Sequence, residues 1–173
     1  MRLFIAVTLG GEMKSALRDI QEQIKKQNIG GNFTKLENLH LTLAFIGEYS
    51  DPDRAAEALG RVSFKPFRIS LDGIGCFGNL WWAGIRDGGE LQKCAAQVRH
   101  CLADARIPFD RKRFSPHITL IREASRPIKA GIIVPEAGMT VEKLSLMRSD
   151  RGKSGMIYTE TASVSCSVPQ TGR

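Results

Sequence analysis

The sequence feature that most constrains the fold is a short pattern that occurs twice. Residues 40–43 read HLTL and residues 117–120 read HITL, so the same spacing of His, Thr and Leu recurs 77 positions later. Each copy ends the same order of expected elements, namely a strand, an amphipathic helix, a turn and the strand that carries the motif. This order indicates an internal duplication. Two copies at so long a period predict a bilobed domain with approximate two-fold symmetry and not a repeat array.

Hydrophobic periodicity places the motifs on strands. Every second residue from Leu39 to Phe45 is apolar, which predicts a strand over residues 38–46. His40 and Thr42 then share the opposite face of that strand. Similar patterns predict further strands at residues 2–8, 67–74, 80–86, 140–148 and 155–164, and helices at residues 11–27, 52–62 and 90–105.

Length and composition are typical of one compact domain. The 173 residues are 42% apolar, which is enough to bury a core. We expect a single domain over residues 1–173, with duplicated halves at about 1–75 and 76–165 and a tail at 169–173. No apolar run approaches the ~18 residues of a membrane-spanning helix, and the leading MRLFIAV is too short for a signal peptide. We therefore expect a cytoplasmic protein with no membrane partner, and we take it as a monomer.

The charge balance favours an anionic partner. The chain carries 25 Lys and Arg against 18 Asp and Glu, a net charge of +7, and such a surplus attracts nucleic acids and nucleotides. Several basic residues near the motifs and toward the end of the chain would line an RNA path: Lys35, Arg111, Lys112, Arg113, Arg148, Arg151 and Lys153. A run of charges is also typical of plain solvated surface, so the charge alone does not decide between the two.

The two motifs suit acid–base chemistry at a phosphate. Residues i and i+2 of a strand lie on one face about 6.6 Å apart, so each motif presents an imidazole and a hydroxyl to the same cleft. With an unperturbed pKa near ~6.5, one His acts as a neutral base while the other acts as a protonated acid. The hydroxyls of Thr42 and Thr119 can donate to the non-bridging oxygens of the phosphate. A single motif of this kind is more often structural, but two copies favour a catalytic pair, His40 and His117.

The chain resembles a known family over essentially its whole length: the two-histidine phosphoesterases, and in particular the RNA 2′,3′-cyclic phosphodiesterases first described as 2′-5′ RNA ligases. Four segments carry the resemblance: MRLFIAVTL, ENLHLTLAFIGE, LWWAGI and FSPHITLIR. It implies an α+β fold in which two pseudo-symmetric lobes of antiparallel sheet, with helices on their outer faces, enclose a central cleft. It also implies hydrolysis of RNA 2′,3′-cyclic phosphodiester ends to 2′-phosphates, without a metal ion or any other cofactor.

The resemblance also implies a role for each matching residue. His40 would donate a proton to the departing 3′ oxygen, and His117 would accept a proton from the attacking water, although a near-symmetric site can exchange these roles. Arg122, five residues after His117, matches an arginine that contacts the phosphate, and guanidinium geometry suits that contact. Strict alternation puts Arg122 on the face opposite to His117. A bulge or the end of the strand must therefore turn it into the cleft.

For the aromatic residues near the motifs, the sequence allows either a contact with the substrate or a place in the core. Phe45 follows His40 at the same offset of five and is a possible contact for the bound base or ribose, although strict alternation favours packing in the core. Trp82 matches a tryptophan of the family, and its neighbour Trp81 lies on the other face of the strand. Either indole could stack on a base, and at least one should be buried. The third histidine, His100, lies opposite the apolar stripe of its helix and is expected to be exposed and without a role.

Three other functions are compatible with parts of this pattern. A metal-dependent phosphodiesterase could also use two histidines, but no carboxylate cluster or further histidine flanks either motif. A non-catalytic RNA-binding module would use the positive charge and the aromatic residues, but it does not explain the second motif. Among enzymes, 2′-5′ RNA ligation and the cleavage of 2′-5′ oligonucleotides or small cyclic phosphates would use the same two histidines.

Overall fold

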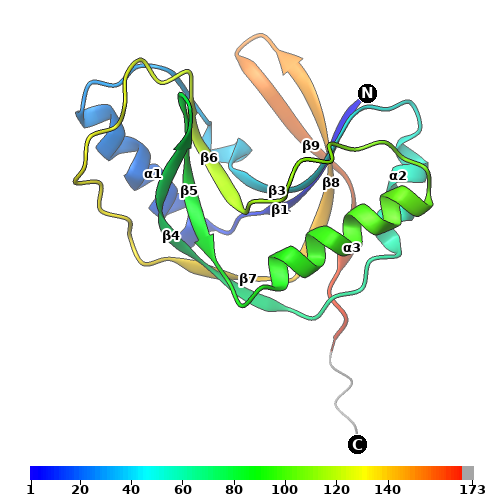
Figure 1. Ribbon diagram of the computed structural model, residues 1–173. Helices are drawn as coiled ribbons and strands as arrows, with labels where there is room; N and C mark the ends of the chain where they lie inside the picture. Colours follow the sequence, from blue (N-terminus) through cyan, green and yellow to red (C-terminus); the bar gives the residue numbers. More distant parts are fainter. Residues whose placement is uncertain (169–173) are drawn as a thin grey trace, which may run out of the picture.

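Two antiparallel sheets form the framework of the protein (Figure 1). The computed structural model describes residues 1–168, so the tail expected at 169–173 lies outside the described residues. The strands of the first sheet are, in spatial order, β3 (His40–Glu48), β1 (Arg2–Thr8), β8 (Lys143–Gly152) and β9 (Gly155–Ser165). The strands of the second sheet are, in spatial order, β2 (Asn32–Phe33), β6 (His117–Arg122), β5 (Leu80–Arg86), β4 (Phe67–Phe77) and β7 (Gly138–Val141). The motif strands β3 and β6 therefore lie in different sheets.

Two α-helices cross from one sheet to the other. α1 (Gly11–Lys26) follows β1 of the first sheet but contacts β6 and β7 of the second. α3 (Glu90–Asp104) follows β5 of the second sheet but contacts β3 of the first. α2 (Pro52–Gly60) lies beside α3 and contacts β8 and β9. Each motif strand is thus supported by a helix whose preceding strand belongs to the opposite sheet.

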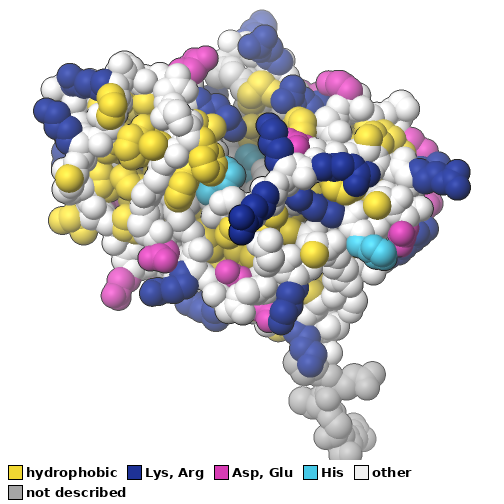
Figure 2. Space-filling model, in the orientation of Figure 1, with side chains coloured by type: hydrophobic (Ala, Val, Ile, Leu, Met, Phe, Trp, Pro, Cys, Tyr) yellow, Lys and Arg dark blue, Asp and Glu magenta, His cyan; other side chains and the backbone are white. Residues whose placement is uncertain are grey.

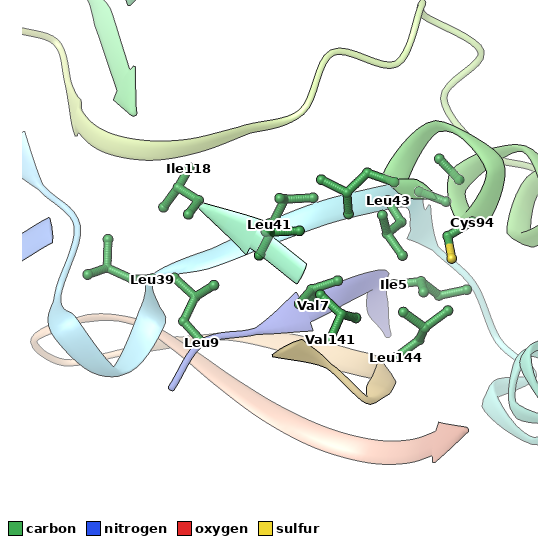
Figure 3. Close-up of a cluster of buried hydrophobic side chains, with 14 of the residues drawn as sticks. Ile5, Val7, Leu9, Leu39, Leu41, Leu43, Cys94, Ile118, Val141 and Leu144 are labelled. Atoms are coloured by element: carbon green, nitrogen blue, oxygen red, sulfur yellow. The ribbon is translucent and has the colours of Figure 1, made fainter. Parts of the chain in front are cut away.

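The sheets and helices share one large core. Figure 3 shows side chains of both motif strands in the same buried cluster, Leu41 and Leu43 from β3 and Ile118 from β6. Val141 of β7 and Cys94 of α3 belong to it as well. Because residues of both sheets bury one another in this cluster, the two lobes are packed directly against each other.

The strand pairing confirms the α+β class and the two antiparallel sheets. β1 and β5 have the bounds that the periodicity predicts. The duplicated halves stay a prediction, but each sheet contains strands from both of them, so one half of the sequence is not one lobe of the structure. In residues 1–168, no helix has the length and apolar character needed to cross a membrane.

The prediction of one strand over residues 140–148 is wrong. β7 ends at Val141 in the second sheet and β8 begins at Lys143 in the first, so the chain passes between the sheets at Glu142. Apolar residues continue on both sides of this crossing, which is why the pattern does not reveal it. β2 and the 3-10 helix η1 (Leu36–Asn38) were also not predicted, because elements of two or three residues show no periodicity.

An extra residue interrupts both motif strands at the same place. The register of β3 with β1 skips Leu43, and the register of β6 with β5 skips Leu120. These are the leucines of the two H-x-T-L motifs. Each bulge buries two residues in succession, Leu43 with Ala44 and Leu120 with Ile121. The alternation of faces is shifted by one residue after each of these bulges, and β3 has a second irregularity further along, at Ile46.

A buried glutamine satisfies the backbone at the second bulge. Gln21 of α1 donates from its Nε2 to the carbonyl oxygen of Leu120 at 3.0 Å and to that of Thr34 at 2.8 Å. The same Leu120 carbonyl accepts from the backbone N–H of Thr34 at 3.0 Å. A buried polar group that loses its partner costs about 1–3 kcal/mol. α1 therefore supports the bulge through this amide as well as through its apolar face.

We predict that Gln21→Leu lowers the free energy of unfolding by about 1–3 kcal/mol. Leucine has a similar size but no donor, so the Thr34 and Leu120 carbonyls both lose the hydrogen bond from this side chain. Urea denaturation followed by circular dichroism would show a lower midpoint at an unchanged slope. Gln92→Leu, on the exposed face of α3, is the matched control. A loss no larger than that of the control would mean that Gln21 does not hold the bulge.

Candidate active site

The imidazoles of the two motifs are held in the same way. Nδ1 of His40 lies 2.6 Å from the carbonyl oxygen of Asn38, and Nδ1 of His117 lies 2.6 Å from that of Ser115. A carbonyl oxygen can only accept, so Nδ1 carries the hydrogen in both rings. Nε2 is then the nitrogen that takes up and releases a proton. Both histidines are prepared for acid–base chemistry through the same atom.

Each imidazole also lies between aromatic rings. The His40 ring centroid is 4.8 Å from that of Phe4 on β1 and 5.2 Å from that of Tyr158 on β9. The His117 ring centroid is 5.4 Å from that of Phe77 on β4 and 6.2 Å from that of Trp82 on β5. Tyr158 and Phe77 meet their histidines edge-on, with interplanar angles of 88°. Of these four aromatic residues, sequence reasoning singled out only the tryptophan.

The two tryptophans divide as the strand geometry requires. Trp82 pairs with Thr119 across the sheet and lies on the His117 face, whereas Trp81 packs against the core. The Trp82 ring lies directly over Gly75 of the neighbouring strand, where any Cβ would collide with the indole. Gly75 therefore makes room for the ring beside His117.

The motif threonines lie beside their histidines. Thr42 Oγ1 is 3.0 Å from His40 Nε2, so the hydroxyl donates to a neutral ring or accepts from a protonated one. Thr119 is half-buried, as is His117, and the residue between them is buried, so the two share the open face of β6. The strand geometry thus presents an imidazole and a hydroxyl from each sheet.

A cavity of about 650 Å³ opens over the first motif. His40, Thr42 and Phe45 of β3 line it together with Arg122 of β6 and Tyr158 of β9. His117 and Thr119 are not among its lining residues, but β6 approaches β3 closely enough for the His117 charge to act on His40. Figure 2 shows histidine side chains in the hollow at the centre of this face, bordered by Lys and Arg.

The bulges decide where Arg122 and Phe45 lie. Arg122 lines the His40 cavity although it belongs to the other sheet, in agreement with the expectation that a bulge turns it inward. Phe45 lines the same cavity and packs on a small cluster of Phe4, Ala6 and Met147, so it lies on the cavity face and not in the main core that strict alternation favours. The Phe45 ring is half-buried, and the Arg2 guanidinium lies 5.0 Å from its centroid. Phe45 and Arg122 occupy equivalent positions in the two motif strands.

The electrostatics of the site lower the pKa of His40. Burial is the main cause that lowers the pKa of His40, and the positive charges of Arg122 and His117 lower it further. The hydrogen bond to the Asn38 carbonyl acts in the opposite direction and raises this pKa. The free protein therefore favours the neutral form of His40 more than solvent does.

Asn38 is a site residue that sequence reasoning missed. Its carbonyl oxygen accepts from His40, and its buried side chain donates from Nδ2 to the carbonyl oxygen of Met156 at 2.8 Å. Met156 belongs to β9, so this amide ties the His40 imidazole to the β8–β9 hairpin. No local pattern signals the role of its side chain, because that role depends on a contact across 118 positions of the chain.

Other predicted residues lie at the edges of the site or away from it. Arg151 lines the His40 cavity, and Arg113 lines a separate cavity of about 550 Å³ beside His117, with Phe77 and Phe114. His100 is exposed on α3, as expected, and its Nε2 lies 3.2 Å from a carboxylate oxygen of the same helix. Within the described part of the chain, no group of three or more His, Cys, Asp or Glu side chains is arranged to hold a metal ion.

Comparison with known proteins agrees with this geometry. The family model described as the 2′-5′ RNA ligase superfamily matches residues 13–153, a span that includes both motifs. A protein of Archaeoglobus fulgidus named RNA 2′,3′-cyclic phosphodiesterase is 32% identical to this chain, over 92% of this chain and 97% of that protein. Both lobes of the fold therefore lie within the similarity.

Two solved structures have the same arrangement of elements. A Thermus thermophilus protein is 31% identical, with a TM-score of 0.83 over 95% of this chain and 97% of that chain. The apo form of E. coli LigT is 26% identical, with a TM-score of 0.81 over 96% of this chain and 98% of that chain. The fold of the whole chain, and not of one lobe alone, is similar to both.

We predict that Arg122→Met raises the pKa of His40 toward its ordinary value, because the substitution removes a positive charge that disfavours the imidazolium. Part of the lowering should remain, since burial is its main cause. An NMR titration of the imidazole resonances measures the change. Arg111→Met is the control, because Arg111 lies over the Phe109 ring and does not line the His40 cavity. An unchanged or lower pKa in the Arg122 variant would contradict the proximity of the two side chains.

Proposed function

This chain belongs to the 2′-5′ RNA ligase superfamily, and we propose that it is a metal-independent phosphodiesterase that opens 2′,3′-cyclic phosphate ends of RNA to 2′-phosphates. One observation carries the proposal. Two imidazoles from different sheets lie near enough for the charge of His117 to act on His40, and each has Nδ1 engaged by a backbone carbonyl at 2.6 Å. Nε2 is then the nitrogen that exchanges a proton, and at His40 it lies 3.0 Å from the Thr42 hydroxyl. The A. fulgidus protein and other relatives of about 30% identity carry the name RNA 2′,3′-cyclic phosphodiesterase, which supports the same reaction.

The proposed reaction is a single in-line displacement at phosphorus. The oxygen of a water molecule forms a bond to phosphorus while the bond from phosphorus to the 3′ oxygen breaks. His117 accepts a proton from the water, and His40 donates a proton to the departing 3′ oxygen. The product is a 2′-phosphomonoester with a free 3′ hydroxyl. Proton exchange with solvent then restores both imidazoles.

Neighbouring donors stabilise the phosphate as its charge redistributes. The hydroxyls of Thr42 and Thr119 donate to the non-bridging oxygens, and the Arg122 guanidinium donates to the same oxygens from the other sheet. Phe45 contacts the ribose or base in the His40 cavity. The cleft positions these groups before the substrate arrives, which is how a site without a metal ion lowers the barrier.

Because the pKa of His40 is lowered, His40 can donate a proton to the 3′ oxygen only if it is protonated in the complex with the substrate. Burial and two neighbouring positive charges disfavour its protonated form in the free protein. A bound phosphate brings negative charge beside the ring and favours the imidazolium. His40 therefore takes up its proton together with the substrate, and the donor activity falls as the pH rises through its pKa in the complex.

Formation of 2′-5′ linkages is a second candidate on the same histidines. A 5′ hydroxyl would take the place of water, and His117 would accept its proton. The cavity of about 550 Å³ beside His117 offers space for the nucleoside that bears this hydroxyl. Phe77, which is 51% exposed, provides an aromatic surface for its base.

We also propose that the protein acts as a monomer in the cytoplasm on RNA or nucleotides with a 2′,3′-cyclic phosphate end. Both histidines come from one chain, so the site needs no residue from a second copy. The four cysteines are free thiols, two of them buried, which suits a reducing compartment.

We predict that His40→Ala and His117→Ala each lower kcat for a 2′,3′-cyclic-phosphate-ended oligonucleotide by at least about 10²-fold, since each removes an acid or base group. The assay contains EDTA, and chromatography identifies the product as the 2′- or 3′-phosphate. His100→Ala is the matched control and should keep full activity. Full retention by either motif variant would contradict the proposal, and rescue only by added zinc or manganese would favour a metal enzyme.

A substrate with sulfur in place of the bridging 3′ oxygen assigns the two roles. A thiolate leaves without a proton, so the variant that lacks the acid should recover activity on it. Recovery by His40→Ala supports His40 as the donor, and recovery by His117→Ala reverses the assignment. If the unaltered protein binds RNA tightly but does not turn it over, the result would exclude the enzyme and favour a non-catalytic RNA-binding module.

A further inference from the structure

A second cavity adjoins the one over His40. It has a volume of about 740 Å³ and shares Arg122, Arg151, Met156 and Tyr158 with the His40 cavity. Its remaining walls come from the C-terminal end of α1, from the segment that contains β2 and from the turn of the β8–β9 hairpin. In Figure 1 this hairpin projects beyond the sheets above the motif strands. A ligand in the His40 cavity can therefore extend into the second cavity without leaving the protein surface.

The walls of the second cavity carry positive charge only. Lys25, Lys35, Arg122 and Arg151 line it, and none of its lining residues is Asp or Glu. Lys25 has an exposed ion pair with Glu22 one turn earlier, a kind of pair that neutralises little. Among the described residues, the other three cations have no carboxylate within ion-pair distance, and Lys35 donates only to the Ser154 hydroxyl, at 3.3 Å. Such a concentration of unpaired cations favours a phosphate.

An aromatic ring accompanies the cations. Phe33 is half-buried in the wall, and Lys25 Nζ lies 5.1 Å from its ring centroid. Tyr158 stands at the boundary of the two cavities, where it also meets His40. Cations beside aromatic rings are the usual combination for single-stranded nucleic acid, because the backbone binds the cations and the bases stack on the rings.

The opposite side of the site differs in charge. The cavity beside His117 is lined by one cation, Arg113, together with Phe77, Phe114 and uncharged residues. A polyanionic chain that leaves the cleft therefore meets four cations on the Lys35 side and one on the Arg113 side.

We propose that the second cavity is a subsite for the nucleotide that precedes the cyclic-phosphate end, with Lys25, Lys35 and Arg151 binding its phosphate and Phe33 its base. The inference rests on the proposed function and adds a direction to it: the RNA leaves the cleft toward the β8–β9 hairpin. It also makes an oligonucleotide, and not a cyclic mononucleotide, the better substrate.

The test compares a cyclic mononucleotide with a short oligonucleotide that bears the same 2′,3′-cyclic phosphate. In the double variant Lys25→Glu/Lys35→Glu, KM for the oligonucleotide should rise at least about tenfold, because charge-assisted phosphate contacts are lost. Turnover of the mononucleotide should stay within about twofold of that of the unaltered protein, since neither lysine lines the His40 cavity. The dependence of log(kcat/KM) on log salt concentration should flatten by about 0.7 for each phosphate contact removed.

Matched variants separate position from net charge. Lys26→Glu/Lys129→Glu changes the net charge equally at exposed residues that line neither cavity, and it should leave the oligonucleotide KM nearly unchanged. An equal rise in this control would overturn the subsite. A large rise with Arg113→Glu and none with Lys25→Glu/Lys35→Glu would overturn it too, because the RNA would then leave past His117.

The failure of the subsite is distinguishable from the failure of the proposed function. If the unaltered protein hydrolyses both substrates with the same KM, the reaction stands and the subsite does not. If it hydrolyses neither, the proposed function fails, and the subsite as proposed here fails with it.

Discussion

An extra residue in each motif strand determines which side chains reach the cleft. A regular strand would send the fifth residue after each histidine into the core, because side chains alternate between the two faces. The bulges at Leu43 and Leu120 shift this alternation, so Phe45 and Arg122 line the cavity over His40. The core side of each bulge is filled by two apolar residues in succession, and a side-chain amide from α1 satisfies the carbonyl at the second bulge. Without this distortion the motifs would present imidazoles and hydroxyls but no guanidinium.

Equivalent positions in the two strands carry different chemistry. One strand places a phenyl ring five residues after its histidine, and the other places a guanidinium. The guanidinium of Arg122 reaches across to the cavity of the other sheet, where burial lowers the pKa of His40 and the Arg122 charge lowers it further. An acid and a base that act in one step must differ in protonation state. The pair of unlike residues Phe45 and Arg122 thus gives the two similarly built strands different chemistry, and Arg122 adds to the effect of burial on His40.

The sequence was sufficient for those parts of the site that depend on local order. Periodicity places His40 and Thr42 on one face of a strand, and the second motif repeats the arrangement. The position of Phe45 could not be predicted from the sequence, because a bulge leaves the order of residues unchanged and alters only their pairing. Two other contacts were not predictable for a different reason: Tyr158 meets the His40 ring from a distant strand, and the Asn38 side chain donates to Met156, 118 positions away. Such contacts follow from the packing of the β8–β9 hairpin on the rest of the first sheet, which no short pattern records.

α1 and α3 cross between the sheets, so the distance between the two histidines depends on how the shared core is packed. Each motif strand rests on a helix that follows a strand of the other sheet, and residues of both strands belong to one buried cluster. Moving one lobe relative to the other would expose that cluster to water at about 25 cal/mol for each Å² of apolar surface. A displacement catalysed by two imidazoles needs this constancy, since a shift of about 1 Å can cost about 10²-fold in rate. The contacts of both helices and the shared cluster therefore fix the relative position of the two imidazoles.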